Sequence, residues 1–123
     1  PMPSACVSAS SEFIQKNPHT VQALTQALSR ALKWLQLCGA SDLLKVLPES
    51  YLLGDRGLYL DIFHQMRESM SRDGLMPEDG PRTALKALLR FDASVLKPGQ
   101  VDLGKSYTNE FARRAASQLR HIA

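Results

Sequence analysis

A single stretch with β-strand alternation stands at the start of a sequence whose other periodic patterns are all helical. Ala5, Val7 and Ala9 alternate with Cys6 and Ser8, and a period of two favours a strand. A lone strand leaves backbone N–H and C=O groups without partners, which costs about 1–3 kcal/mol for each group that is buried. We therefore expect the strand to pair with residues that precede this sequence, or with a second copy of the chain.

The rest of the sequence predicts five or six helices. The longest begins at Pro18, with Asn17 as its N-cap, and stops at Gly39. Apolar residues at three- and four-residue spacing predict one buried stripe on this helix: Val21, Leu24, Leu28, Ala31, Leu35 and Cys38. Trp34 widens the stripe, which favours core packing over a stacking platform for a ligand.

Shorter helices are predicted over residues 12–17, 42–47, 57–70 and 107–120, and one more begins near Asp79. Their apolar positions form further core candidates: Leu58, Ile62, Phe63, Met66 and Met70; Leu85, Leu88 and Leu89; Tyr107, Phe111, Ala115 and Leu119. The predicted fold class of this segment is mainly α, with one N-terminal strand.

Length and composition are those of one globular domain: 123 residues, 44% of them hydrophobic. No apolar run reaches the roughly 18 residues of a membrane span, and residues 1–20 lack the regions of a signal peptide. The net charge is +3, but Lys and Arg are spread along the sequence. Their densest group, Arg113, Arg114, Arg120 and His121, predicts a solvated helix face, and we expect no nucleic-acid partner.

No catalytic, metal-binding or cofactor pattern emerges from the remaining polar residues. His19, His64 and His121 lie far apart, and we expect His64, Asp61 and Glu68 to be polar side chains on a solvent-facing side of their helix. The run GDRG at 54–57 lacks the spacing of a phosphate-binding loop, and DGLMPEDG at 73–80 lacks the ligand order of a calcium loop. Cys6 and Cys38 are expected to be small buried side chains, and a disulfide between them has no support in the sequence.

Several segments in order resemble one protein family. They are EFIQKNPHTVQALTQALSRALKWLQ, LPESYLLGDRGLYL, DGLMPEDG with the following TALKALLRFD, and VDLGKSYTNEFA. This pattern is similar to the C-terminal part of periplasmic substrate-binding proteins of the nitrate, sulfonate and taurine class, which serve ABC importers. The resemblance covers nearly all of the chain.

The resemblance implies a type II periplasmic-binding-protein fold with two α/β lobes, in which residues 1–123 form a single segment. Residues from about 4 to 10 would form the strand that crosses back through the hinge to lobe one. The helices that follow would complete lobe one by packing on it. The implied function is binding of a small anion or heterocycle for an ABC permease, in the periplasm, without catalysis or cofactor. Met2 to Cys6 would lie near the hinge and the cleft edge, so Ser4 is the one candidate ligand-binding residue within this sequence.

An alternative is a free-standing small helical protein that dimerises or binds a partner through surplus apolar surface. In both cases we expect the chain alone to be helical, and to associate through the strand or through the face that lobe one would cover.

Overall fold

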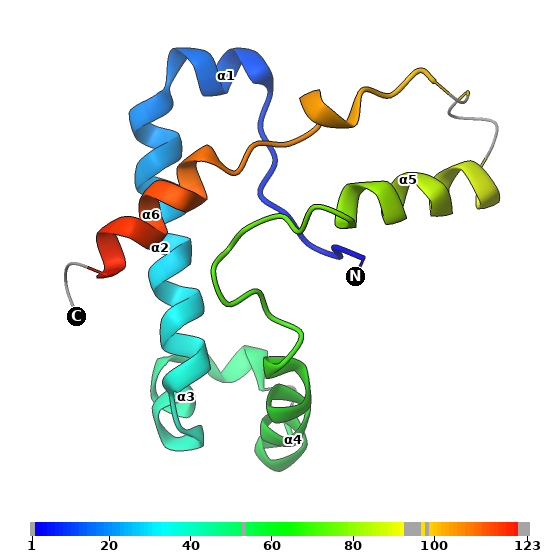
Figure 1. The fold of residues 1–123 in the computed structure, drawn as a ribbon. Helices are drawn as coiled ribbons and strands as arrows, with labels where there is room; N and C mark the ends of the chain where they lie inside the picture. Colours follow the sequence, from blue (N-terminus) through cyan, green and yellow to red (C-terminus); the bar gives the residue numbers. More distant parts are fainter. Residues whose placement is uncertain (1, 53, 93–96, 98, 121–123) are drawn as a thin grey trace.

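The computed structural model describes residues 2–52, 54–92, 97 and 99–120. Within these ranges the chain is helical and contains no strand. Figure 1 shows α2 as an upright column that α6 crosses, with α3 and α4 at its lower end and α5 projecting to one side. The elements are α1 Ser11–Lys16, α2 Pro18–Leu37, α3 Ala40–Val46, η1 Glu49–Tyr51, α4 Arg56–Arg67, α5 Gly80–Phe91, η2 Leu103–Lys105 and α6 Glu110–Arg120, where η marks a 3-10 helix. The prediction of a mainly helical segment is confirmed.

The N-terminal segment runs as an extended chain and pairs with no other described segment (Figure 1). The predicted strand is therefore wrong for this chain as it stands, because a strand forms only when another supplies its hydrogen bonds. Cys6 is exposed, which corrects the expectation that it is buried. The segment is anchored by Pro3, since a Cβ added to the buried Gly80 would lie 3.2 Å from Cδ of Pro3.

Local chemistry accounts for several helix starts. Ser10 Oγ accepts a hydrogen bond from Phe13 N at 3.1 Å and so caps α1. Pro18 occupies the first turn of α2, where a missing N–H costs nothing. Asp55 Oδ1 accepts from Leu58 N at 2.9 Å and caps α4. These helices therefore begin where the sequence supplies the cap.

One hydrophobic cluster joins the lower end of α2 to α3 and α4. Its buried members are Cys38, Leu43 and Phe63, and the burial predicted for Cys38 is confirmed. The Arg67 guanidinium stacks on the Phe63 ring, 4.7 Å from its centroid, and Nη2 of Arg67 donates to the Cys38 carbonyl at 2.7 Å. This end of the molecule therefore closes around its own core.

A second packing region lies where α6 crosses α2, the most extensive contact between helices in the described chain. The buried residues of α6 are Phe111, Ala112 and Ala115. The two alanines allow the helix backbones to approach closely, and Ala115 is fully buried. Gln22 Nε2 donates to the Phe111 carbonyl at 3.0 Å across the crossing.

The face of α2 that is buried is largely polar. Its buried and half-buried residues on this side are Gln22, Thr25, Ser29, Leu32 and Gln36. The apolar stripe lies on another side of the helix, where Leu24 is 51% and Leu28 is 40% exposed and Ala31 is also exposed. The prediction of a buried stripe is therefore wrong for these three residues, although the helix itself forms as predicted.

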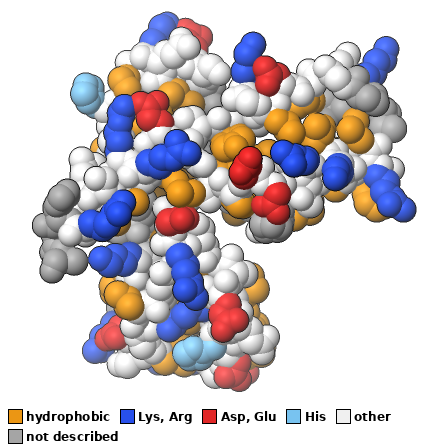
Figure 2. Space-filling view, viewed as in Figure 1, with side chains coloured by type: hydrophobic (Ala, Val, Ile, Leu, Met, Phe, Trp, Pro, Cys, Tyr) orange, Lys and Arg blue, Asp and Glu red, His pale blue; other side chains and the backbone are white. Residues whose placement is uncertain are grey.

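Further apolar side chains of α4 and α5 are open to solvent. They are Leu58, Ile62, Met66, Leu88 and Phe91. Figure 2 shows hydrophobic side chains uncovered over the arm that contains α5. The accessible surface is 9572 Å², whereas a compact monomer of this mass exposes roughly 6,600 Å². This open shape leaves apolar faces that the described chain does not cover.

Candidate functional site

A turn over residues 71–75 carries part of a hollow beside α2. Asp73 Oδ1 accepts from Leu75 N at 3.0 Å, and Gly74 N donates to Ser71 Oγ at 2.9 Å. Gly74 has a φ of 72°, a backbone conformation that costs other residues about 1–2 kcal/mol. Gln36 Nε2 on α2 donates to the Ser71 carbonyl at 3.1 Å, so the turn is fixed against α2.

Asn109, immediately before α6, holds the other end of this turn. Its Oδ1 accepts from Met76 N at 2.9 Å, and its Nδ2 donates to the Met76 carbonyl at 3.0 Å. An amide side chain can make both bonds because it carries a donor and an acceptor side by side. The fold thereby joins two of the motif segments, the one around Met76–Pro77 and the one around Asn109.

Between α2, α6 and this turn lies a cleft of about 730 Å³. Its lining comes from three elements: Ser29, Lys33 and Gln36 of α2; Arg72, Asp73 and Leu75 of the turn; Arg113, Ala116, Leu119 and Arg120 of α6. We call it the basic cleft, since its lining includes one carboxylate, that of Asp73, and four cationic side chains: Lys33, Arg72, Arg113 and Arg120. In Figure 2, Lys and Arg side chains gather where α6 crosses α2.

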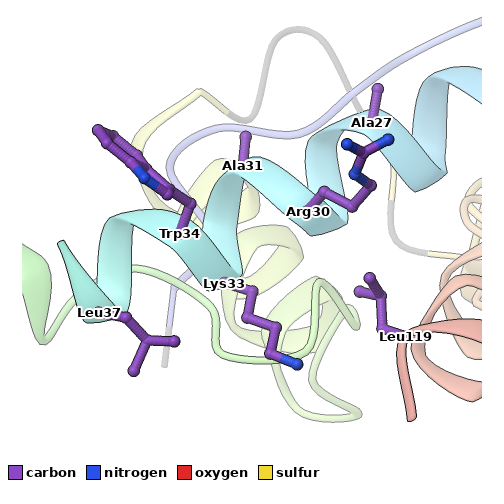
Figure 3. Close-up of a pocket in the computed structure, with 7 residues that line it drawn as sticks. All are labelled: Ala27, Arg30, Ala31, Lys33, Trp34, Leu37 and Leu119. Atoms are coloured by element: carbon purple, nitrogen blue, oxygen red, sulfur yellow. The ribbon is translucent and has the colours of Figure 1, made fainter. Parts of the chain in front are cut away.

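A second hollow, of about 670 Å³, adjoins the basic cleft and shares Lys33 and Leu119 with it. Figure 3 shows its lining along the outer side of α2, with Leu119 reaching toward it from α6: Ala27, Arg30, Ala31, Lys33, Trp34, Leu37 and Leu119. Trp34 is 39% exposed here, so it is not a core residue of this chain as the sequence predicts.

The residues that the sequence marks for chemistry do not meet in either hollow. Ser4 is exposed on the N-terminal segment and lines neither of them. In the described ranges no three His, Cys, Asp or Glu side chains are placed to hold a metal ion, and His121 lies outside those ranges. None of the helices described combines the length and apolar content needed to cross a bilayer.

The sequence does not reveal the basic cleft because its members lie in three separate segments, up to 91 positions apart from Ser29 to Arg120. It marked Arg113 and Arg120 as a solvated helix face and assigned Asp73 to a turn. Lys33 and Arg72 carried no signal of their own. The helical offset between Ser29 and Lys33 was the one available hint, since residues four apart share a helix face.

One solved structure with the same fold is that of a protein from Bordetella bronchiseptica RB50. It has 44% sequence identity and a TM-score of 0.92 over 97% of this chain, but the match covers 37% of that chain. The present chain thus spans little more than a third of the length of the protein that it matches. No family model matches the sequence, and no curated protein does.

Proposed function

We propose that this chain is the C-terminal segment of a solute-binding protein that delivers a small anion or heterocycle to an ABC importer. In this proposal the helices complete lobe one of a two-lobed, periplasmic α/β protein of the nitrate, sulfonate and taurine class. The segment binds and positions, and it carries out no chemistry.

The observation that carries the proposal is the orientation of α2. Leu24 and Leu28 face solvent while Ser29 is buried. The hydrophobic effect favours the opposite arrangement, with the leucines buried and the serine exposed, if these helices form a complete protein. Leu24 is 51% and Leu28 is 40% exposed, so each forfeits roughly half of the about 1.5–3 kcal/mol that full burial of a leucine contributes. A layer that packs on this stripe removes the conflict, and the lobe-one core is such a layer.

Three further observations agree with this reading. In the Bordetella protein, the segment with this fold makes up 37% of the chain. The same set of helices therefore occurs there as part of a longer protein. Residues 2–10 run extended and are available to join a sheet whose other strands lie elsewhere. The motif residues Met76 and Asn109, on which the resemblance partly rests, bond to each other.

A chimera tests the proposal. The matched 37% of the Bordetella chain would be replaced by this sequence, which the 44% identity and shared fold permit. We expect a folded monomer whose melting temperature rises with one member of a panel of nitrate, sulfate, taurine, an alkanesulfonate and a pyrimidine, because ligand that binds only the native state stabilises it. The parent Bordetella protein is the matched control.

The outcomes separate this function from the alternative of a small dimerising protein. If the parent responds to a ligand and the folded chimera does not, this segment does not complete a binding lobe of that kind. If the chain alone is a stable helical dimer and the chimera does not fold, the dimerising protein is the better reading.

A further inference from the structure

We propose that the basic cleft between α2, α6 and the 71–75 turn binds a small organic anion that carries two or more phosphate or carboxylate groups. This site is separate from the solute site implied above, to which Ser4 was assigned. The inference does not depend on the proposed function, because every residue it uses belongs to the present chain.

The lining of the cleft is strongly basic. Lys33, Arg72, Arg113 and Arg120 line the cleft with Asp73 as the one acidic residue among them. Asp73 Oδ1 is already used by the turn, where it accepts from Leu75 N. The cleft therefore holds a net excess of three positive charges.

The pairing of charges elsewhere in the chain makes this excess distinctive. Five ion pairs join other described residues: Lys16–Glu12, Lys45–Asp42, Arg56–Glu49, Lys105–Asp102 and Arg114–Glu110. In the described structure no carboxylate pairs with any of the four cations of the cleft. Neighbours on α6 show the contrast, since Arg114 pairs with Glu110 and Arg113 faces the cleft unpaired. Cations of one sign gathered in a hollow concentrate their field there and attract an anion.

The floor of the cleft offers a hydrogen-bond donor. Ser29 is 9% exposed and lines the hollow, and its hydroxyl makes no hydrogen bond among the described residues. The fully buried side-chain atoms without a partner in the described chain are Gln22 Oε1 and Arg67 Nε, so the Ser29 hydroxyl is open to solvent and can donate to a ligand oxygen. Gly74 lies over it without a side chain: a Cβ there would come within 3.7 Å of Ser29 Oγ.

Size and lining define the class of ligand. A volume of about 730 Å³ falls within the roughly 300–1,000 Å³ of small-molecule sites. Three guanidinium groups suit phosphate and carboxylate oxygens, which they can bind through two parallel hydrogen bonds. Leu75, Ala116 and Leu119 add an apolar wall. The cations converge on one hollow instead of following a track, so a compact organic anion fits better than a nucleic-acid strand.

Calorimetric titration of the chain with pyrophosphate and with citrate, at constant ionic strength, tests the site. The variant Lys33→Gln with Arg113→Gln removes two cations from the cleft, and we expect Kd to rise at least about tenfold for the better probe, since charged hydrogen bonds contribute about 1.5–3 kcal/mol each. The charge-matched control is Lys86→Gln with Arg90→Gln on α5, outside both hollows, which should change Kd less than about twofold. Circular dichroism verifies that both variants fold.

Three results would overturn the inference. One is equal weakening by the two double variants, which would mean diffuse attraction by the net charge. Another is no heat or saturation with either probe up to millimolar concentration. The third is a single-stranded oligonucleotide that binds more tightly than both probes and depends on the same two cations, which would assign the cleft to nucleic acid.

Discussion

Phe63→Ala is expected to lower the free energy of unfolding by about 3–5 kcal/mol. Phe63 is 6% exposed and lies in the cluster with Cys38 and Leu43. The truncation opens a cavity there and also removes the ring on which the Arg67 guanidinium rests. Whole domains have stabilities of only about 5–15 kcal/mol, so the lower end of the molecule should lose its fold first.

Urea denaturation followed by circular dichroism measures this effect. Leu58→Ala on the same helix is the control, because Leu58 is 57% exposed and should change stability by no more than about 0.5 kcal/mol. Phe63→Leu should fall between the two. If Phe63→Ala and Leu58→Ala unfold at the same urea concentration, the α2–α3–α4 cluster is not a core.

Asn109→Ala is expected to cost about 1–3 kcal/mol, because it leaves the N–H and C=O of Met76 without their partners. The backbone bonds to Asn109 are partly buried. Asn109→Asp keeps the acceptor for Met76 N but turns the donor into an oxygen that faces the Met76 carbonyl, so it should be no better tolerated. Hydrogen exchange of the Met76 amide should quicken in both variants.

Ser117→Ala on α6 supplies the comparison for Asn109, since Ser117 is exposed and the substitution is expected to change stability by no more than about 0.5 kcal/mol. Unchanged protection of the Met76 amide in Asn109→Ala would mean that the turn is held by other contacts, such as the bond from Gln36 to Ser71.

Local signals in the sequence were sufficient for the helices. Asn17 and Pro18 located the start of α2, and the helix ends within two residues of Gly39. The start predicted for α6 at 107 is wrong: the helix begins at Glu110, and its first hydrogen bond runs from Arg113 N to the Asn109 carbonyl at 3.0 Å. The predicted helix over 57–70 ends at Arg67, where hydrogen bonds tighten to three-residue spacing, as from Met70 N to the Arg67 carbonyl.

What covers each helix face could not be read from the sequence. The spacing of Leu24 and Leu28 indicates residues that gain from burial, but it does not say that a covering layer is present in the same chain. The same holds for residues 5–9, whose alternation favours a strand only where another strand is adjacent. The basic cleft was invisible for a related reason, since Lys33, Arg72 and Arg113 become neighbours only through tertiary packing.

The measurement that tests the central claim most directly is the labelling rate of a thiol placed on the exposed stripe of α2. Leu28→Cys in a Cys6→Ser background would be labelled in the chain alone, diluted until light scattering shows a monomer, and in the Bordetella chimera, with Ser117→Cys on α6 as the reference thiol. The account predicts fast labelling of position 28 in the chain, where Leu28 is 40% exposed, and strong protection in the chimera, while labelling of position 117 changes little. Equal labelling of position 28 in both proteins would contradict the claim that this stripe is the face on which another layer packs.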